Sequence, residues 1–292
     1  LAAGGAGPFW TIAGHRDIPV TATVHDPPQG VWMPGYVQGI ASRRLLLHGI
    51  HYPLRPVSRA LEGVINGRRM LFALTETGRR SIAETYPKTH TVYIPHLVRE
   101  RPEILPAEQR PKAVGFFGHV YRGKGFEQIA GIRRLLPPDI SIRVAGRGTE
   151  SLPRAEGIDI VGPVDGKAED EFFESVRAVV VPYGKRHFYA ETYPASGVVA
   201  HATAYCTPIV TTGYGSLAEL DEEDGATVVP IDRTEPDAVA TGMAEAISSL
   251  VNDNDRLARL GKNSARTRDD RSTARTAEAF VAAWREFLDP QL

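Results

Sequence analysis

The segment that decides the fold is residues 178–220, AVVVPYGKRHFYAETYPASGVVAHATAYCTPIVTTGYGSLAEL. The apolar run at 178–181 predicts a buried strand, and a polar loop leads from it to a Ser-Gly step that opens a helix. A second apolar run at 208–212 predicts the next strand, which is closed by Gly-Tyr-Gly-Ser. Strand-loop-helix joins of this kind present backbone N–H groups to an anion. The segment therefore indicates a parallel α/β unit with an anion-binding helix end.

The same alternation continues on both sides of this segment. Short strand-like runs such as AVGFFG and ISIRVAG alternate with helical runs such as GFEQIAGIRRLL and PDAVATGMAEAISSLV. Near-continuous apolar strands between amphipathic helices specify a parallel sheet that is covered on both faces. In the helix after residue 125, Phe126, Ile129, Ile132 and Leu136 form the stripe expected to face the sheet. We predict a complete Rossmann-like domain over residues 111–271.

The first 110 residues contain only three strand-like runs, PVTATV, MLFALT and TVYIP. A doubly wound domain normally supplies about twice that number, so we expect residues 1–110 to form an incomplete domain whose start is missing. The Gly/Pro/aromatic stretch at 26–39 is a candidate acceptor-recognition loop, and the Pro-rich stretch at 103–112 predicts an interdomain linker. An apolar stripe in residues 280–288 predicts a final helix that must bury against something.

Composition limits the classes of function. The 292 residues are 42% hydrophobic, which supports packed cores, and the net charge of -1 gives no global attraction to nucleic acid. Local Arg pairs are candidate docking points for peripheral membrane association, although most such pairs lie on solvated helix faces. No apolar run approaches the roughly 18 residues that span a bilayer. The single cysteine, Cys206, excludes an internal disulfide and indicates a cytoplasmic protein.

Together with GFFGHVYRGKGF at 115–126 and VTATVHD at 20–26, the segment resembles the nucleotide-sugar half of a retaining glycosyltransferase of family four, the glycosyl transferases group 1. The resemblance implies the α/β GT-B architecture, with two Rossmann-like domains whose parallel sheets face a cleft. The N-terminal domain, on the acceptor side, would be incomplete. The helix at 272–292 would pack back toward it.

The glycine-rich loop at 118–125 carries the candidate cations. Mobile cations beside a helix N-terminus suit a diphosphate, because their charge adds to the helix dipole. Lys124 and Gly125 match the Lys-Gly step of the family, whereas His119 stands where the family usually has Arg after the strand's Gly118. Arg122 would supply the missing charge. The alternative is an ordinary turn with two exposed cations.

The helix opened by Ser196 and Gly197 departs from the family pattern of two glutamates eight positions apart. Counting back from Thr207-Pro208 puts His201 at the second glutamate and Tyr193 at the first, which leaves Glu191 two residues upstream. Some members instead have a Pro-Tyr loop and a Ser-Gly helix start, where hydroxyl and backbone N–H groups hold the diphosphate. A simple Ser N-cap is the alternative. His201 can donate to a ribose hydroxyl but lacks the bidentate acceptor geometry of glutamate.

Two further regions resemble donor-site positions. Gly215, Ser216 and Glu219 resemble the family's glycine-containing turn, from which Glu219 would face the cleft. The alternative is a carboxylate in a first helical turn, where the dipole favours it. His25 follows PVTATV at a strand end, where the family commonly places a His facing the donor sugar. A lone His there is otherwise structural.

The sequence contains no Ser-His-Asp order and no Cys/His metal spacing. The acidic triplet at 253–255 is better explained by Asp255 as a helix N-cap than by a metal site. The resemblance therefore implies a metal-independent hexosyltransferase-like enzyme with no cofactor beyond its nucleotide-sugar substrate. It would move a sugar, with retention, to an acceptor hydroxyl on a glycan, glycolipid or small molecule, using His25, Lys124 and Arg122. The alternatives are a non-catalytic nucleotide-sugar-binding protein of the same fold and, less favoured, a nucleotide-sugar epimerase.

Overall fold

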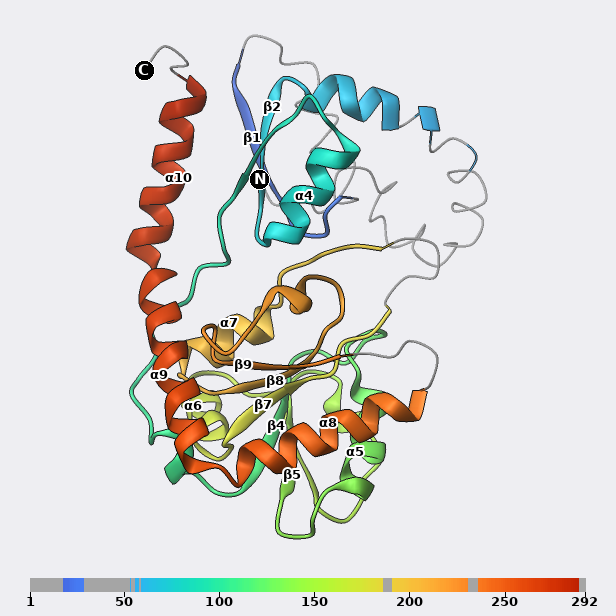
Figure 1. The fold of residues 1–292 in the computed structure, drawn as a ribbon, viewed down its shortest axis with the longest axis vertical. Helices are drawn as coiled ribbons and strands as arrows, with labels where there is room; N and C mark the ends of the chain where they lie inside the picture. Colours follow the sequence, from blue (N-terminus) through green and yellow to red (C-terminus); the bar gives the residue numbers. More distant parts are fainter. Residues whose placement is uncertain are drawn as a thin grey trace. The chain divides into compact units, whose positions relative to one another are not determined.

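The computed structural model describes residues 18–28, 53, 56, 57, 59–185, 191–230 and 236–288. The chain divides into two compact units (Figure 1). The first comprises Leu1–His96, Thr192–Ala195 and Thr276–Leu292, and the second comprises Leu97–Glu191 and Ser196–Arg275.

The second unit is built on a six-stranded sheet in which every neighbouring pair is parallel. Its strands are β4 (Ala113–Phe117), β5 (Ser141–Ala145), β6 (Ile158–Gly162), β7 (Ala178–Val181), β8 (Ile209–Thr212) and β9 (Ala226–Val229). Their order is β6-β5-β4-β7-β8-β9, so the direction in which strands are added reverses between β4 and β7. Open α/β sheets bind ligands at the carboxyl ends of the strands beside such a reversal.

Two apolar cores cover the two faces of this sheet. Along β7, Val180 belongs to one core, whereas Val179 and Val181 belong to the other, because successive side chains of a strand point to opposite faces. The first core contains α5 (Ile129–Leu135), α8 (Pro236–Val251) and α9 (Asn254–Asp270), and the second contains α6 (Gly166–Glu174) and α7 (Gly197–Ala204). The expected stripe at Phe126, Ile129, Ile132 and Leu136 lies in the first core, which confirms that prediction.

The segment 103–112, for which we expected a linker, packs on the second unit. Its Arg110 is only 2% exposed, and burial lowers the pKa of this guanidinium to about 10. Arg110 donates to the carbonyl oxygens of Leu105, Phe173, Val176 and Tyr205 and to the hydroxyl of Thr207. Since these acceptors come from three separate stretches of chain, the guanidinium ties the segment to the ends of α6 and α7.

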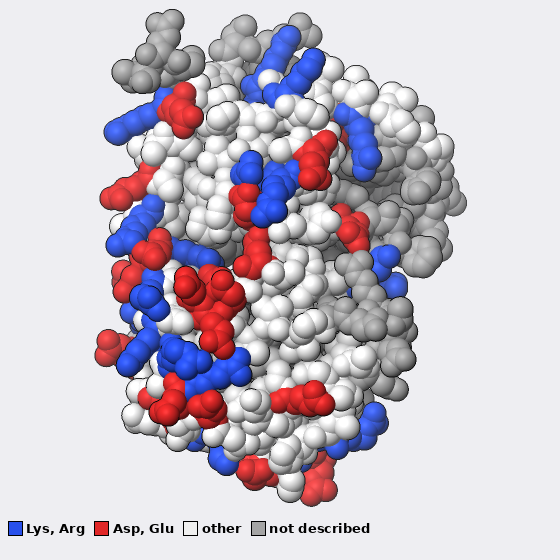
Figure 2. Space-filling view, in the orientation of Figure 1, with Lys and Arg blue, Asp and Glu red and all other residues white. Residues whose placement is uncertain are grey.

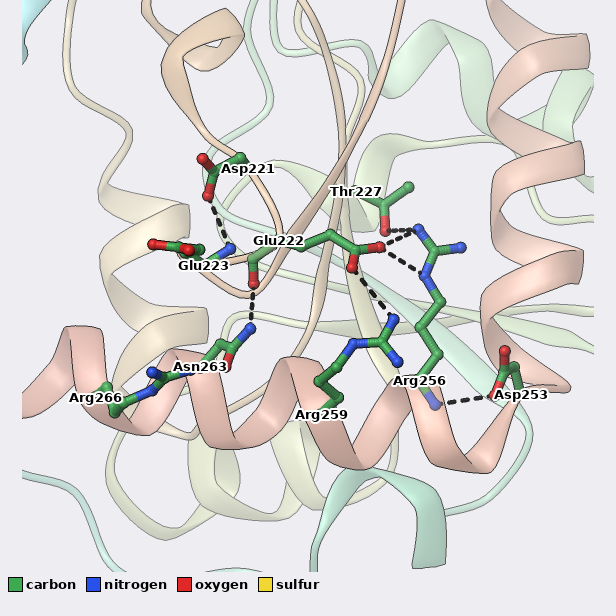
Figure 3. Close-up of polar contacts among 9 residues, drawn as sticks. All are labelled: Asp221, Glu222, Glu223, Thr227, Asp253, Arg256, Arg259, Asn263 and Arg266. Carbon is green, nitrogen blue, oxygen red and sulfur yellow. Dashed lines mark hydrogen bonds and ion pairs between the residues drawn. The ribbon is translucent and has the colours of Figure 1, made fainter.

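An acidic loop at 221–225 fixes α9 beside β9 (Figure 3). The carboxylate of Glu222 accepts from Nε of Arg256 at 3.0 Å and from Nη2 of Arg259 at 3.2 Å. The N-cap of α9 is Asp253, whose side chain accepts from the backbone N–H of Arg256 at 2.9 Å. The sequence-based assignment of the cap to Asp255 was therefore wrong: Asp255 lies inside the first turn. On the face shown in Figure 2, basic and acidic side chains are interspersed over this part of the unit.

The first unit contains β1 (Val20–Val24), β2 (Arg69–Ala73) and β3 (His90–Tyr93), paired in parallel in that order. These strands coincide with the three runs identified in the sequence. Residues 59–66 are helical, and α4 (Glu76–Thr85) begins at the N-cap Thr75. The candidate acceptor loop at 26–39 lies outside the described residues from residue 29 onward.

The last helix, α10 (Thr273–Leu288), places its aromatic residues on the sheet of the first unit. The ring centroid of Phe72 lies 4.7 Å from that of Phe280 and 6.4 Å from that of Trp284. The indole N–H of Trp284 donates to the hydroxyl of Thr21 at 3.2 Å. These contacts bury part of the apolar stripe seen in the sequence, whereas Val281, Trp284 and Leu288 stay exposed. No helix in the described part of the chain is long and apolar enough to cross a membrane.

Candidate functional site

Two loops of the second unit meet where the strand order reverses. One loop, residues 118–125, follows β4, and the other, residues 182–185, follows β7. The backbone N–H of Gly184 donates to the carbonyl of Gly123 at 3.1 Å. The two loops therefore form one rim at the carboxyl ends of the strands, next to the N-terminus of α7.

Glycines at two points allow this rim to pack closely. Gly125 has φ +76°, and a Cβ there would lie 2.0 Å from the carbonyl oxygen of Pro182. Gly146, in the turn after β5, has φ +131°, and a Cβ there would lie 1.9 Å from the carbonyl oxygen of Gly118. Both backbone conformations are rarely adopted by residues with side chains. Glycine is therefore required at 125 and 146 for the loop 118–125 to keep its position.

Lys124 is held over an aromatic side chain. Its Nζ lies 3.9 Å from the ring centroid of Tyr183 and 5.3 Å from that of Tyr121, and it hydrogen-bonds the Tyr183 hydroxyl. Burial raises the pKa of Tyr183, which keeps the phenol neutral. A neutral aromatic partner orients the ammonium group without cancelling its charge.

The same tyrosine connects Lys124 to the start of α7. Oγ of Ser196 donates to the Tyr183 hydroxyl at 3.1 Å and accepts from the backbone N–H of Val199 at 3.4 Å. Ser196 is thus the N-cap of α7, the simpler of the two roles considered from sequence. A Cβ at the exposed Gly197 would meet nothing within 4 Å. Lys124 and the N-cap of α7 therefore share Tyr183 as a partner, and the backbone at Gly197 beside them is open. A cation next to the positive end of a helix dipole suits an anion.

His201 lies further along α7 in a polar cluster of its own. Its Nδ1 is 2.7 Å from Oε1 of Glu169, which also accepts from Nη2 of Arg101 at 2.8 Å. Its ring centroid lies 5.1 Å from that of Phe117, the last residue of β4. His201 is therefore near the carboxyl end of β4. Sequence reasoning missed Glu169 and Arg101, because they lie 32 and 100 positions before His201 in unrelated segments.

The other candidate residues of the second unit lie in loops or a short helix. His119 and Arg122 are exposed on the loop after Gly118, and Glu191 is exposed beyond the loop that follows β7. Gly215 and Ser216 open a short 3-10 helix, Gly215–Glu219.

Glu219 is the exposed last residue of that helix. The alternative of a carboxylate in a first helical turn does not apply, since the dipole disfavours an anion at a helix C-terminus. His25 belongs to the first unit and is exposed directly after β1. Tyr193 also belongs to the first unit, where its backbone N–H donates to the carbonyl of Pro27 at 2.8 Å. Within the described ranges, no three His, Cys, Asp or Glu side chains are grouped to hold a metal ion.

Comparison with known proteins finds one matching family model. Residues 111–253, just under half of the chain, match the family model described as "Glycosyl transferases group 1". No curated protein sequence matches the chain. The matched region contains Lys124, Tyr183, Ser196 and His201.

Several solved structures share the fold. Sucrose-phosphate synthase from Thermosynechococcus elongatus is 17% identical, with a TM-score of 0.67 over 97% of this chain and 71% of that one. HepE from Anabaena, in a complex with UDP and glucose, is 12% identical, with a TM-score of 0.63 over 92% of this chain and 72% of HepE. TarM is 14% identical, with a TM-score of 0.58 over 94% of this chain and 51% of TarM. The expected α/β fold with parallel sheets is confirmed, and it matches GT-B glycosyltransferase structures.

Proposed function

We propose that this chain is a glycosyltransferase that moves a sugar from a nucleotide-diphosphate donor to an acceptor hydroxyl, with retention at the anomeric carbon and without a metal or other cofactor. The observation that carries the proposal is the connection of Lys124 and the α7 N-cap through Tyr183, within the region that matches the glycosyltransferase family. A cytoplasmic location is part of the same proposal.

Lys124 and the backbone N–H groups at the start of α7 would stabilise the departing diphosphate, because fixed donors and charges act strongly at a site of developing negative charge. Arg122 adds a second cation from the same loop, and the backbone at Gly118, His119 and Gly125 lets the diphosphate approach. The acceptor hydroxyl would attack from the face that the diphosphate leaves, as retention requires.

The remaining candidate residues surround the donor in this proposal. His201 contacts the ribose of the nucleotide. Glu191, Gly215, Ser216 and Glu219 line the sugar side. His25 would position the sugar for attack.

The proposal is tested by titrating the protein with UDP, GDP and ADP in a calorimeter, then with the sugar-diphosphate form of the best ligand. Lys124→Ala should weaken diphosphate binding and lower turnover at least tenfold, a loss of about 1.4 kcal/mol. Lys167→Ala is the matched control, since Lys167 is an exposed lysine of the same unit that pairs only at the surface with Glu171. Equal binding and turnover in Lys124→Ala and Lys167→Ala would refute the diphosphate assignment.

The same binding and turnover measurements distinguish the two alternative functions. Donor binding without any sugar transfer or release would favour a non-catalytic nucleotide-sugar-binding protein. A nucleotide sugar with an epimerised ring carbon, formed without an acceptor, would favour an epimerase.

A further inference from the structure

The contact between His201 and Glu169 determines which ring nitrogen of the histidine faces a ligand. Glu169 is buried, with its side chain 6% exposed, and it accepts from Arg101, whose side chain is 19% exposed. The His201 side chain is 37% exposed at the edge of the sheet beside Phe117. The polar cluster thus has a buried end at Glu169 and an accessible end at His201.

A carboxylate that accepts a hydrogen bond from a guanidinium is an acceptor-only group. The Nδ1 atom of His201, 2.7 Å from Oε1 of Glu169, must therefore carry the proton that joins them. In a neutral imidazole the second nitrogen is then an acceptor. Within the part of the chain that the structure describes, no hydrogen bond occupies Nε2 of His201.

We infer that Glu169 is a positioning residue, which holds His201 as the Nδ1–H tautomer so that Nε2 accepts a hydrogen bond from a ribose hydroxyl of the donor nucleotide. The inference rests on the proposed function and deepens it. It reverses the donor role that the sequence suggested for His201, because the proton lies on the nitrogen that faces Glu169.

The placement on α7 fits a nucleotide that lies along the helix. His201 is five residues after the N-cap Ser196, about 7.5 Å along the helix axis at 1.5 Å per residue. This spacing lies within the length of a nucleoside diphosphate whose phosphates contact the N-terminus of α7. The Nε2 atom of a neutral imidazole would then accept the ribose hydrogen bond that a glutamate would accept in the family pattern. The carboxylate of Glu169, in α6, would hold the imidazole in place.

The test compares binding of the best nucleoside diphosphate with binding of its 2′,3′-dideoxy analogue, by calorimetry. The wild type should prefer the ribonucleotide by about tenfold, the effect of one or two hydrogen bonds. Glu169→Ala and His201→Ala should abolish this preference while still binding the diphosphate. Glu169→Gln should retain it, because both Arg101 and His201 contact the single oxygen Oε1 that the amide preserves.

Tyr205→Phe is the structural control. The Tyr205 hydroxyl donates to Asp170 at 2.5 Å and so also joins the end of α7 to α6, but it does not touch His201. This variant should keep the preference for the ribonucleotide. A loss as large as that in Glu169→Ala would overturn the inference in favour of general packing between the two helices.

Nitrogen-15 NMR of the imidazole gives a reading that does not depend on binding. The His201 signals, identified by their absence in His201→Ala, should show a protonated Nδ1 and an unprotonated Nε2 in the wild type. A protonated Nε2 would overturn the inference, as would equal binding of the two nucleotides by the wild type. No binding of any nucleoside diphosphate by the folded wild type would instead overturn the proposed function, and this inference with it.

Discussion

Replacing Gly125 by alanine tests whether the rim of the site depends on the close contact of its two loops. The new Cβ would lie 2.0 Å from the carbonyl oxygen of Pro182 and 2.7 Å from its carbonyl carbon. Ordinary contacts of a Cβ begin at about 3.4 Å, so the loop that carries Lys124 must move by about 1 Å or more. Relieving such an overpacked contact costs about 1–3 kcal/mol. The φ of +76° adds about 1 kcal/mol for a residue with a side chain.

The effect on activity should exceed the effect on folding. A displacement of about 1 Å in a positioning group can cost about 100-fold in rate, and the displaced loop separates Lys124 from Tyr183. We expect Gly125→Ala to lower the urea midpoint, to weaken diphosphate binding and to reduce turnover by about two orders of magnitude. Unfolding is followed by circular dichroism and binding by calorimetry.

Gly184→Ala is the matched control, because it lies in the facing loop and a Cβ there would meet nothing within 4 Å. Its backbone N–H would still donate to Gly123. We expect this variant to fold and bind like the wild type. If Gly125→Ala also behaves like the wild type, the close packing of the two loops does not position Lys124, and the reasoning is refuted.

Two further predictions concern stability. Cys206 follows α7 with φ +51°, a backbone conformation that favours glycine. Cys206→Gly should therefore stabilise the protein by about 0.5–1 kcal/mol in urea unfolding. A lower urea midpoint would show that the contact of the thiol with Arg268 contributes more to stability than the backbone strain costs. Burial of Glu222 opposes ionisation, but hydrogen bonds from Arg259 and Arg256 outweigh it and hold its pKa below the ordinary 4.5. A lowered pKa stabilises the folded state above pH 4.5, and this contribution is lost as pH falls through the folded value. The destabilisation caused by Glu222→Gln should therefore be full at pH 7 and vanish at lower pH, and a difference that stays constant from pH 7 to pH 3 would contradict it.

The sheet and its cores could be predicted from sequence because their signals are local. Buried parallel strands such as β7 read as continuous apolar runs, since both faces of the strand meet a core. The spacing of Phe126, Ile129 and Ile132 likewise identifies one face of a helical segment without any knowledge of its neighbours. Local patterns of this kind are sufficient to establish the fold class and to place the glycine-rich loop after a strand.

Features that depend on distant residues could not be predicted. Nothing near Arg110 indicates that its guanidinium is buried, because most of its acceptors come from residues 63 to 97 positions away. The acidic triplet offers two aspartates that could each cap a helix, and only the extended backbone of Asp253 decides between them. For the same reason the sequence shows His201 as a departure from the family pattern but does not show Glu169 beside it.

The pairing of His201 with Glu169 also bears on whether a glutamate would fit at position 201. A carboxylate at 201 would lie within reach of the buried Glu169, and two neighbouring carboxylates repel each other. Arg101 contacts one carboxylate of the cluster, at 2.8 Å, and a single guanidinium charge cannot neutralise two. Histidine avoids this repulsion, because its ring carries no negative charge and can donate to Glu169 through Nδ1, which in the proposed tautomer leaves Nε2 as an acceptor. The identities of residues 169 and 201 are therefore coupled. A histidine at 201 presents Nε2 as an acceptor only when residue 169 supplies a hydrogen-bond acceptor to Nδ1.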